Sequence, residues 1–400
     1  MKIIIVTTFF SKEMGYAENG ISKALASLGH EVHLITSNLN VYGDSPNYDD
    51  NYLSFLGPAD QGVGSFDYYG CKVHRLPSRS IAGYVLITGL VNKIREINPE
   101  IVHCITMASL STYVLALLKP FFNFSLFSES HQHASVVREE LKSSKFHPII
   151  RTVYFLTRTL PTYLASFSIE KCYAISPDCL HVAEKFYGIP KNKLELINIG
   201  CDTNLFHPVN DKLMENNRKI KRNSFGYDDD DIVCIYTGRL SDEKNPLLLA
   251  QAINSLSEVS KKWRVIFIGN GSQYEQILLN KGVTVIPFML YTQLPGIYRM
   301  ADIGVWPTQE SLSMLDASAA GLPLVLSDQI GDKGRIAGNG YFYVENNLNS
   351  MIEKLSKLQD LNERREMSLA GFKNIEENYS WNSIVKKYIY SYKKIRRNYE

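Results

Sequence analysis

The chain lacks the features that mark several common classes of protein. Its 400 residues carry a formal net charge of only +2, which is too little for a nucleic-acid binder that relies on a large basic field. The six cysteines form no C-x-x-C pair and no zinc-type spacing, so we expect reduced thiols in the core and a cytoplasmic location. No apolar stretch reaches the roughly 18 to 20 residues of a membrane-spanning helix, and we expect a chain that does not span a bilayer.

The sequence does contain an alternation of short β-branched runs with longer helical patterns. The first run, KIIIVTT, predicts a buried strand and is followed by a helical stretch and a second run, EVHLIT. The pattern restarts after about residue 206, where a polar, charge-rich join covers 206–231. Runs that are apolar at nearly every position are typical of parallel strands covered by helices on both faces. We therefore predict an α/β fold of two Rossmann-like domains, 1–205 and 206–379, facing across a cleft that holds a ligand.

Two basic amphipathic segments leave alternatives open. Segment 380–400 has apolar residues at helical spacing, and we favour a helix that packs back on the first domain over one that lies on a membrane surface. These apolar residues are Trp381, Ile384, Tyr388 and Tyr392. Segment 147–167, HPIIRTVYFLTRTLPTYLASF, mixes apolar and basic residues, and a buried helix or a membrane contact explains it about equally well.

The stretch YTGRLSDEKNP combines a strand end, a glycine turn and two cations. Arg239 and Lys244 flank an acidic pair, and a helix is predicted to begin near Asn245 and Pro246, where proline is a good start signal. Cations beside a strand end and a helix N-terminus can hold a pyrophosphate, with arginine making a forked contact. A solvated charged loop would explain the same residues.

The stretch QESLSMLDASAAGLP places two carboxylates, Glu310 and Asp316, before a run of small residues. They could grip a substrate, next to a helix whose backbone N–H groups point at an anion. They could also be structural, since Ser313 lies three residues before Asp316 as in a capping box. In both cases we predict a helix from about residue 314 to 320, stopped by the glycine and proline that follow.

Two further stretches carry weaker signals. In FSESHQHASVV, the residues Glu129, His131 and His133 could suggest a metal site, but packing or a polar contact explains H-x-H better. In IGNGSQYEQ, residues 268–276, a glycine-rich turn lies between a strand and a helix without the G-x-G-x-x-G spacing. We predict that these glycines serve tight packing.

Taken together, these residues resemble a retaining glycosyltransferase of family 4, among the glycosyl transferases group 1, with the GT-B fold. The resemblance covers nearly the whole chain and rests on GHEVHLIT, PEIVHCI, LINIGCDTNLFHP, TGRLSDEKN, IGNGSQ and ADIGVWPTQESLSMLDASAAGLPLVLS. The combination of GRL-x-x-EKN with the later acidic motif is specific, whereas each part alone would be weak. The resemblance implies an acceptor-side first domain and a second domain that binds a nucleotide-sugar donor.

The resemblance also implies roles for individual residues. Arg239 and Lys244 hold the donor diphosphate, Glu310 contacts the donor sugar, and Asp316 binds the ribose. His131 lies near the transferred sugar and is a catalytic residue together with Glu310, Arg239 and Lys244. The other donor-site positions are Gly15 near the diphosphate, Pro287 and Phe288 at the base, and Ser311, Leu312 and Ser313 between the two acids.

The implied reaction moves a sugar from a nucleotide-diphosphate-sugar donor to an acceptor hydroxyl with retention, by front-face attack. Cations aimed at the diphosphate stabilise the leaving group. No D-x-D-like loop demands a divalent metal, and we expect that none is required. The expected acceptor is a glycan or a lipid-linked sugar in surface glycan or glycolipid synthesis. Peripheral contact with the inner membrane face is an option, and no nucleic-acid partner is expected.

The sequence departs from the family pattern at three places. Five residues separate Glu310 from Asp316 where seven are usual, Ser311 and Ser313 replace glycines, and the loop KEMGYAEN has one glycine where a pair is common. A nucleotide-sugar epimerase of the same fold is an alternative, and it would consume donor without any acceptor. A non-catalytic sugar-binding or partner subunit is another alternative. Loss of the acidic residues would mark an inactive subunit, and both residues are present.

Overall fold

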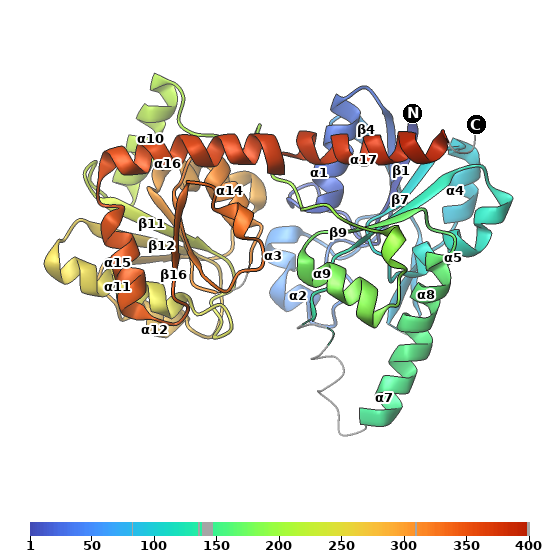
Figure 1. Ribbon diagram of the computed structural model, residues 1–400, viewed down its shortest axis with the longest axis horizontal. Coiled ribbons are helices and arrows are strands. Elements are labelled where there is room, and N and C mark those ends of the chain that lie inside the picture. The colour runs from blue at the N-terminus through green and yellow to red at the C-terminus, as the bar shows by residue number, and fades with distance from the viewer. Residues whose placement is uncertain (82, 135–136, 138–146, 309, 398–400) are drawn as a thin grey trace. The chain divides into compact units, whose positions relative to one another are not determined.

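The computed structural model describes residues 1–81, 83–134, 137, 147–308 and 310–397, and the chain divides into two compact units. Unit 1 comprises 1–199 together with 384–400, and unit 2 comprises 200–383. The division falls between Ile199 and Gly200, a few residues before the boundary that the sequence suggests. Figure 1 shows both units as sheets with helices packed around them.

Within the described residues, the core of unit 1 is an eight-stranded sheet in the order β10-β9-β8-β7-β1-β2-β4-β3. Neighbouring strands are parallel except β3, which runs antiparallel to β4 at one edge. Strands β7 and β8 are buried at every position, as continuous apolar runs predict. The strands are β1 (Lys2–Val6), β2 (Glu31–Ser37), β3 (Gly64–Tyr68), β4 (Cys71–Leu76), β7 (Ile101–Cys104), β8 (Ser125–Ser130), β9 (Lys171–Ala174) and β10 (Leu194–Leu196), beside a hairpin of β5 (Ser78–Ile81) and β6 (Tyr84–Ile87).

Helices cover both faces of this sheet. Buried apolar residues of α4, α5, α8 and η3 share one hydrophobic cluster with alternate residues of the strands. Helix α17 packs on the opposite face. The helical elements of unit 1 are α1 (Ala17–Ser27), α2 (Tyr48–Asn51), α3 (Leu53–Leu56), α4 (Leu90–Ile97), α5 (Leu110–Leu118), α7 (His147–Tyr154), α8 (Leu160–Ser166), α9 (Pro177–His181), the 3-10 turns η1 (Lys119–Phe121) and η4 (Lys191–Lys193), and the π-helical turns η2 (Phe155–Thr159) and η3 (Val182–Phe186).

The C-terminal segment forms α17 (Trp381–Arg396), as predicted, and residues 398–400 lie outside the described residues. Its four apolar residues at helical spacing are at most 7% exposed. Tyr388 and Tyr392 contact the ring of His103 on β7, with centroids 5.1 and 6.0 Å away. Tyr388 and Tyr392 of this helix therefore pack on the sheet of unit 1.

The core of unit 2 is a six-stranded parallel sheet, within the residues described, in the order β13-β12-β11-β14-β15-β16. Its strands are β11 (Ile232–Thr237), β12 (Trp263–Ile268), β13 (Val283–Ile286), β14 (Ile303–Trp306), β15 (Leu324–Ser327) and β16 (Gly340–Tyr343). Its helical elements are α10 (Lys212–Ser224), α11 (Pro246–Val259), α12 (Tyr274–Leu278), η5 (Tyr291–Gln293), α13 (Leu294–Met300), α14 (Ser313–Ala319), η6 (Lys333–Arg335), α15 (Leu348–Lys357), α16 (Leu361–Asn374) and η7 (Ile375–Tyr379). Both sheets are of the Rossmann-like type that the sequence predicts.

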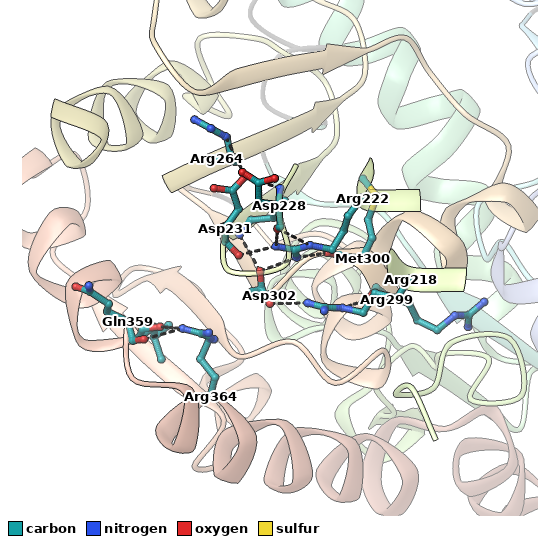
Figure 2. A network of polar contacts seen from close by, with 12 residues as sticks. Arg218, Arg222, Asp228, Asp231, Arg264, Arg299, Met300, Asp302, Gln359 and Arg364 are labelled. Atoms are coloured by element: carbon teal, nitrogen blue, oxygen red, sulfur yellow. Dashed lines mark hydrogen bonds and ion pairs between the residues drawn. The ribbon is translucent and has the colours of Figure 1, made fainter. Parts of the chain in front are cut away.

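The charge-rich join at 206–231 is an integral part of unit 2 rather than a loose connection. Its helix α10 buries Arg222 completely, and Figure 2 shows this guanidinium among acceptors from two stretches, 228–231 and 300–302. Arg222 donates to the carbonyls of Met300 and Asp231 and lies 3.1 Å from the carboxylate of Asp302, which also binds Arg218 at 2.7 Å. A buried arginine is tolerated when its donors are paired, so this network fixes α10 to the sheet.

Candidate functional site

The loop between β11 and α11 carries the two predicted cations. Arg239 has a 74% exposed side chain, and its Nη2 lies 2.7 Å from Glu243 Oε1. Lys244 is half-buried, and burial lowers the pKa of its ammonium group. Helix α11 begins at Pro246, as predicted. Two cations therefore lie at the carboxyl end of a central parallel strand, where open α/β sheets bind ligands.

The glycine-rich turn that contains Gly269 and Gly271 packs against this loop. A Cβ on Gly269 would lie 2.0 Å from the carbonyl oxygen of Gly238, and one on Gly271 would lie 2.4 Å from that of Leu240. Gln273 completes the contact, since its side chain accepts from Leu247 N and donates to Asp242. The glycines of IGNGSQ thus serve tight packing, as predicted, and hold the cationic loop in place.

The acidic stretch lies beside the cationic loop, because β14 pairs with β11 in the sheet. Two hydrogen bonds join the stretches: Thr308 Oγ1 donates to Glu243 O at 2.8 Å, and Ser313 Oγ donates to Thr237 O at 3.2 Å. A small pocket between them is lined by Tyr236, Thr237, Gly238, Lys244, Trp306, Thr308 and Ser311. The tertiary structure therefore brings together the two motifs that lie about seventy residues apart in the chain.

Helix α14 occupies 313–319, close to the predicted range, but it has no capping box. Its N-cap residue is Leu312, without a side-chain cap, and Ser313 is already helical. The Oγ atoms of Ser313 and Ser311 lie 2.6 Å apart. The structural alternative of a Ser313–Asp316 capping box is wrong, because each of these side chains has another partner.

Glu310 is anchored to the loop that follows β15. Its Oε1 accepts from the backbone N–H of Asp332 at 2.6 Å, and its Oε2 lies 3.5 Å from Nη2 of Arg335. Arg335 is buried and also donates to the carbonyl of Ser311 at 2.6 Å. These contacts fix the direction of the Glu310 carboxylate. A carboxylate has about four acceptor positions, so a sugar hydroxyl can still bind to it.

Asp316 is only 5% exposed and lies on α14 beneath Tyr291. Its Oδ1 accepts from Tyr291 Oη at 3.2 Å and from Cys201 Sγ at 3.3 Å. Burial raises the pKa of Asp316 to about 7, although these two hydrogen bonds oppose the shift. The carboxyl group therefore changes charge near neutral pH, which is a common property of functional acids.

Three other predicted donor-site residues lie at the same edge of the unit 2 sheet. Pro287 and Phe288 directly follow β13 and are exposed, Phe288 by 39%. Leu312 is half-buried at the start of α14. An exposed aromatic ring at a strand end can stack on a nucleotide base.

Gly15 and His131, the remaining predicted residues, belong to unit 1. His131 directly follows β8, and its Nε2 lies 2.5 Å from Glu129 Oε2. The other oxygen of Glu129 accepts from Tyr388 Oη at 2.8 Å and lies 3.1 Å from Nε2 of His103. Burial alone would raise the pKa of Glu129, but the hydrogen bonds and charges of His103 and His131 outweigh it and hold this pKa at about 2. An ionised carboxylate thus orients the imidazole of His131.

A second buried acid, Glu18, lies at the start of α1 after the loop that contains Gly15. Burial raises the pKa of Glu18 to about 7, while the charge of His131 opposes this shift. A pocket of about 420 Å³ opens beside the same loop, and its lining includes Ser11, Lys12 and Arg75. The carboxyl edge of the unit 1 sheet is therefore polar, with one imidazole held by a buried acid.

The H-x-H pair does not form a metal site among the residues that the structure describes. His133 Nδ1 binds Asp178 Oδ2 at 3.1 Å, whereas His131 binds Glu129. No group of three metal-ligating side chains occurs in the described part of the chain. The histidines make polar contacts, which is the alternative that the sequence favours.

Sequence reasoning missed the side chains that hold the site residues in place. They include Arg335 beside Glu310, Tyr291 and Cys201 beside Asp316, and His103 and Tyr388 beside Glu129. Only Tyr388 carried any signal, as part of an amphipathic helix. The others come from segments far away in the sequence, so no local pattern links them to the site.

Comparison with known proteins agrees with this geometry. Residues 20–205 match the family Glycosyltransferase Family 4, and residues 217–373 match Glycosyl transferases group 1. Spore coat protein SA from Bacillus subtilis (strain 168) is 27% identical over 227 residues, which cover 52% of this chain and 60% of that protein. The chain thus matches less than two thirds of the length of this relative.

Solved structures resemble the entire chain. Sucrose-phosphate synthase from Thermosynechococcus elongatus has a TM-score of 0.68 at 16% identity and covers 100% of both chains. Anabaena Alr3699/HepE in complex with UDP has a TM-score of 0.66 at 14% identity and covers 98% of this chain and 100% of that one. At this level of identity the likeness shows the fold. The two family matches and the shared fold show that the chain belongs to the glycosyl transferases group 1, glycosyltransferases of the GT-B fold.

Proposed function

We propose that the protein transfers a hexose from a nucleotide-diphosphate-sugar donor to an acceptor hydroxyl with retention of anomeric configuration. The observation that carries this proposal is the juxtaposition of Arg239 and Lys244 with the Ser311–Asp316 stretch at one sheet edge. A diphosphate leaving group gains charge as the glycosidic bond breaks, and fixed cations stabilise that charge. Lys244 is the better placed of the two, since it lines the pocket with Ser311.

The remaining donor contacts follow from the same edge. Phe288 and Pro287 receive the base, Oδ2 of Asp316 accepts from a ribose hydroxyl, and Glu310 accepts from a hydroxyl of the sugar. Ser311, Leu312, Ser313 and, from unit 1, Gly15 complete the donor contacts, with the serine hydroxyls near the phosphates. His131 contacts the transferred sugar, with Glu129 as the residue that positions it.

The chemistry needs neither a metal nor a covalent intermediate in this proposal. The charge of the diphosphate is met by Arg239 and Lys244, and the acceptor hydroxyl attacks the face that the leaving group departs from. We propose that an acceptor glycan or lipid-linked sugar enters the 420 Å³ pocket of unit 1, where Lys12 and Arg75 suit an acceptor that carries phosphate or carboxylate groups. Lys12→Ala should then raise KM for such an acceptor more than KM for the donor.

A thermal-shift screen across nucleotide-diphosphate sugars tests the donor site, because a ligand that binds only the folded state raises its apparent stability. UDP-sugars are the first to try, since UDP is bound in the solved HepE structure. Stabilisation by one donor in the presence of EDTA, lost in Arg239→Ala and Lys244→Ala, supports the proposal. Consumption of that donor without acceptor would point to an epimerase, and binding without turnover on any acceptor would point to a sugar-binding subunit.

A further inference from the structure

Unit 1 presents an exposed helical rod made of α7, the π-helical turn η2 and α8. Among residues 148–157, every side chain is exposed except those of Ile150 and Tyr154. Figure 1 shows α7 at the far end of this rod, away from the sheet of unit 1. The sequence left a buried helix and a membrane contact equally open for this segment, and its exposure excludes the buried helix.

The exposed side chains of the rod are large and apolar. The rod surface consists of Ile149, Val153, Phe155, Leu156, Leu164 and Phe167, which are 51 to 64% exposed. Steps of four, three, eight and three residues lead from Ile149 through Val153, Leu156 and Leu164 to Phe167, so these five return to one face of the rod. A contiguous apolar surface of this kind on a soluble protein usually marks an interaction site.

A neighbouring element extends this surface. Helix α5 packs on α8, where Tyr113 Oη lies 2.9 Å from Thr162 Oγ1. One turn further along α5, Leu117 is 76% exposed, and Phe121 in η1 is 78% exposed. Exposed apolar side chains therefore also occur on the elements next to the rod.

The opposite side of the rod is firmly attached to unit 1. Tyr84 Oη donates to the carbonyl of Thr157 at 2.7 Å, and Lys193 Nζ donates to the carbonyls of Ser166, Phe167 and Ile169 at 2.7 to 2.9 Å. The rod thus has one side bound to its own unit and another that is available to a partner.

The charges on the rod indicate the chemistry of that partner. Between His147 and Ile169 the sequence contains two arginines and no aspartate or glutamate. Arg151 is exposed, and Arg158 stacks on Tyr84 with 4.7 Å between the guanidinium carbon and the ring centroid. Apolar residues flanked by arginine, without acidic residues, complement a bilayer whose headgroups are anionic.

We propose that the rod surface binds an anionic lipid bilayer, with α7, η2 and α8 lying in the interface and their apolar side chains among the acyl chains. No helix in the described ranges is both long enough and apolar enough to cross a bilayer. The exposed Arg151 faces the headgroups, whereas Arg158 stays stacked on Tyr84. The proposal stands on the exposed rod alone and does not depend on the proposed function.

Flotation of the full chain with lipid vesicles tests this inference. The wild type should float with vesicles of phosphatidylcholine and phosphatidylglycerol and should bind phosphatidylcholine vesicles much less. Replacing Ile149, Val153 and Leu156 together by serine removes three apolar side chains and should lower the bound fraction about tenfold or more. Arg151→Glu should weaken binding to the anionic vesicles alone.

A matched control replaces three exposed apolar residues of unit 2, Leu213, Val259 and Leu369, by serine. The control variant should float like the wild type, and both triple variants should keep the wild-type melting temperature and donor affinity. Failure of the wild type to float, or equal flotation of the Ile149/Val153/Leu156 variant, would overturn the proposal. A concentration-dependent dimer that the rod variant abolishes, without vesicle binding, would overturn it as well and assign the surface to a second copy. Donor binding is read separately in unit 2, so its loss would count against the proposed function only.

Discussion

Glu129 in unit 1 and Asp316 in unit 2 are both almost fully buried, at 1% and 5% exposure, yet their pKa values differ by several units. Burial would raise the pKa of Glu129, but hydrogen bonds and charge interactions with His103 and His131 hold this pKa at about 2. Among the residues that the structure describes, Asp316 receives hydrogen bonds from the neutral groups of Tyr291 and Cys201, and burial raises its pKa to about 7. The comparison shows that the hydrogen bonds and charges of neighbouring groups, rather than burial alone, decide whether a buried acid is ionised.

The same difference extends to the sites around the two acids. In unit 1, both carboxylate oxygens of Glu129 have partners within the protein before any ligand binds, from His131, His103 and Tyr388. In unit 2, Arg239 forms a surface ion pair with Glu243, and such pairs contribute little to stability. The cationic loop can therefore exchange Glu243 for the phosphates of a donor at small cost.

Replacing Glu129 in unit 1 should have the largest effect on stability and activity. In Glu129→Gln, the buried His103 and the half-buried His131 lose their carboxylate, and breaking a buried pair typically costs about 3 to 5 kcal/mol of stability. We expect a lower melting temperature, a loss of transfer activity and a changed pH profile of kcat, because His131 is no longer oriented. Tyr388→Phe keeps the charges and removes one hydrogen bond to Glu129, so it should cost only about 1 kcal/mol. An unchanged pH profile in Glu129→Gln would show that Glu129 is merely structural.

Removing the cations of unit 2 should affect binding without unfolding the protein. Charge-assisted contacts contribute about 1.5 to 3 kcal/mol each, so Arg239→Ala and Lys244→Ala should each reduce donor affinity and turnover about ten- to a hundredfold. The control is Lys262→Ala, which removes an exposed lysine that pairs with Asp230 in the same unit. Wild-type donor affinity in both loop variants would refute the diphosphate assignment.

Asp316 should make donor binding depend on pH. If a ribose hydroxyl donates to its carboxylate, the ionised form binds, and affinity for the nucleotide sugar should rise about tenfold from pH 6 to pH 8, since each pKa unit is a factor of ten. Isothermal titration calorimetry at several pH values measures this dependence. Asp316→Asn should bind more weakly, with a flat pH profile. A wild-type profile that is already flat would count against the ribose contact.

Stability should respond to pH in the opposite sense to binding. The raised pKa of Asp316 means that the folded state binds more protons than the unfolded state between about pH 4 and pH 7, so the free energy of unfolding falls as pH rises through this window. Glu18, whose pKa is also about 7, contributes with the same sign. Glu129 contributes with the opposite sign, because its stabilisation is present above about pH 4.5 and is lost toward its folded pKa of about 2. Urea unfolding of Asp316→Asn should therefore show a smaller decline between pH 4 and 7.

Glu310→Gln should have the smallest effect. Glutamine keeps one acceptor oxygen for the N–H of Asp332 and loses the charge opposite Arg335. A neutral hydrogen bond contributes about 0.5 to 1.5 kcal/mol, so turnover should fall about two- to tenfold while affinity for the nucleoside diphosphate stays unchanged. A loss of nucleotide affinity equal to the loss of turnover would contradict a contact to the sugar.

The sequence predicted most of the fold, and the strands that it missed have a common property. Strands β3 and β16 lie at sheet edges, and β5 and β6 form a separate hairpin with exposed residues. None of these four strands is buried at more than two positions, so they lack the fully buried apolar run on which the strand predictions rest. The buried central strands were predicted because their apolar runs are continuous. Helix α11 was predicted from its start signal at Pro246.

The two amphipathic segments show that the sequence pattern of a helix does not determine whether its apolar face is buried. Both α17 and the rod combine apolar residues at helical spacing with basic residues. The tertiary structure buries Tyr388 and Tyr392 of α17 and exposes Ile149 and Val153 of the rod. Helical spacing identifies an apolar face, but the surface that covers this face belongs to another part of the chain or to a partner.

The sequence by itself determined two α/β units, the cationic loop of Arg239 and Lys244, and the family, because these depend on local runs and on the order of motifs along the chain. Only the tertiary structure decided whether the buried acids Glu129 and Asp316 are ionised. Glu129 is ionised because His103 comes from β7 and His131 follows β8. The pKa of Asp316 is raised to about 7 because the fold buries it, and the hydrogen bonds from Tyr291 and Cys201, which come from segments before it in the chain, do not offset this burial. Burial and charge act over a few ångströms of space, and residues at that distance can lie anywhere in the sequence.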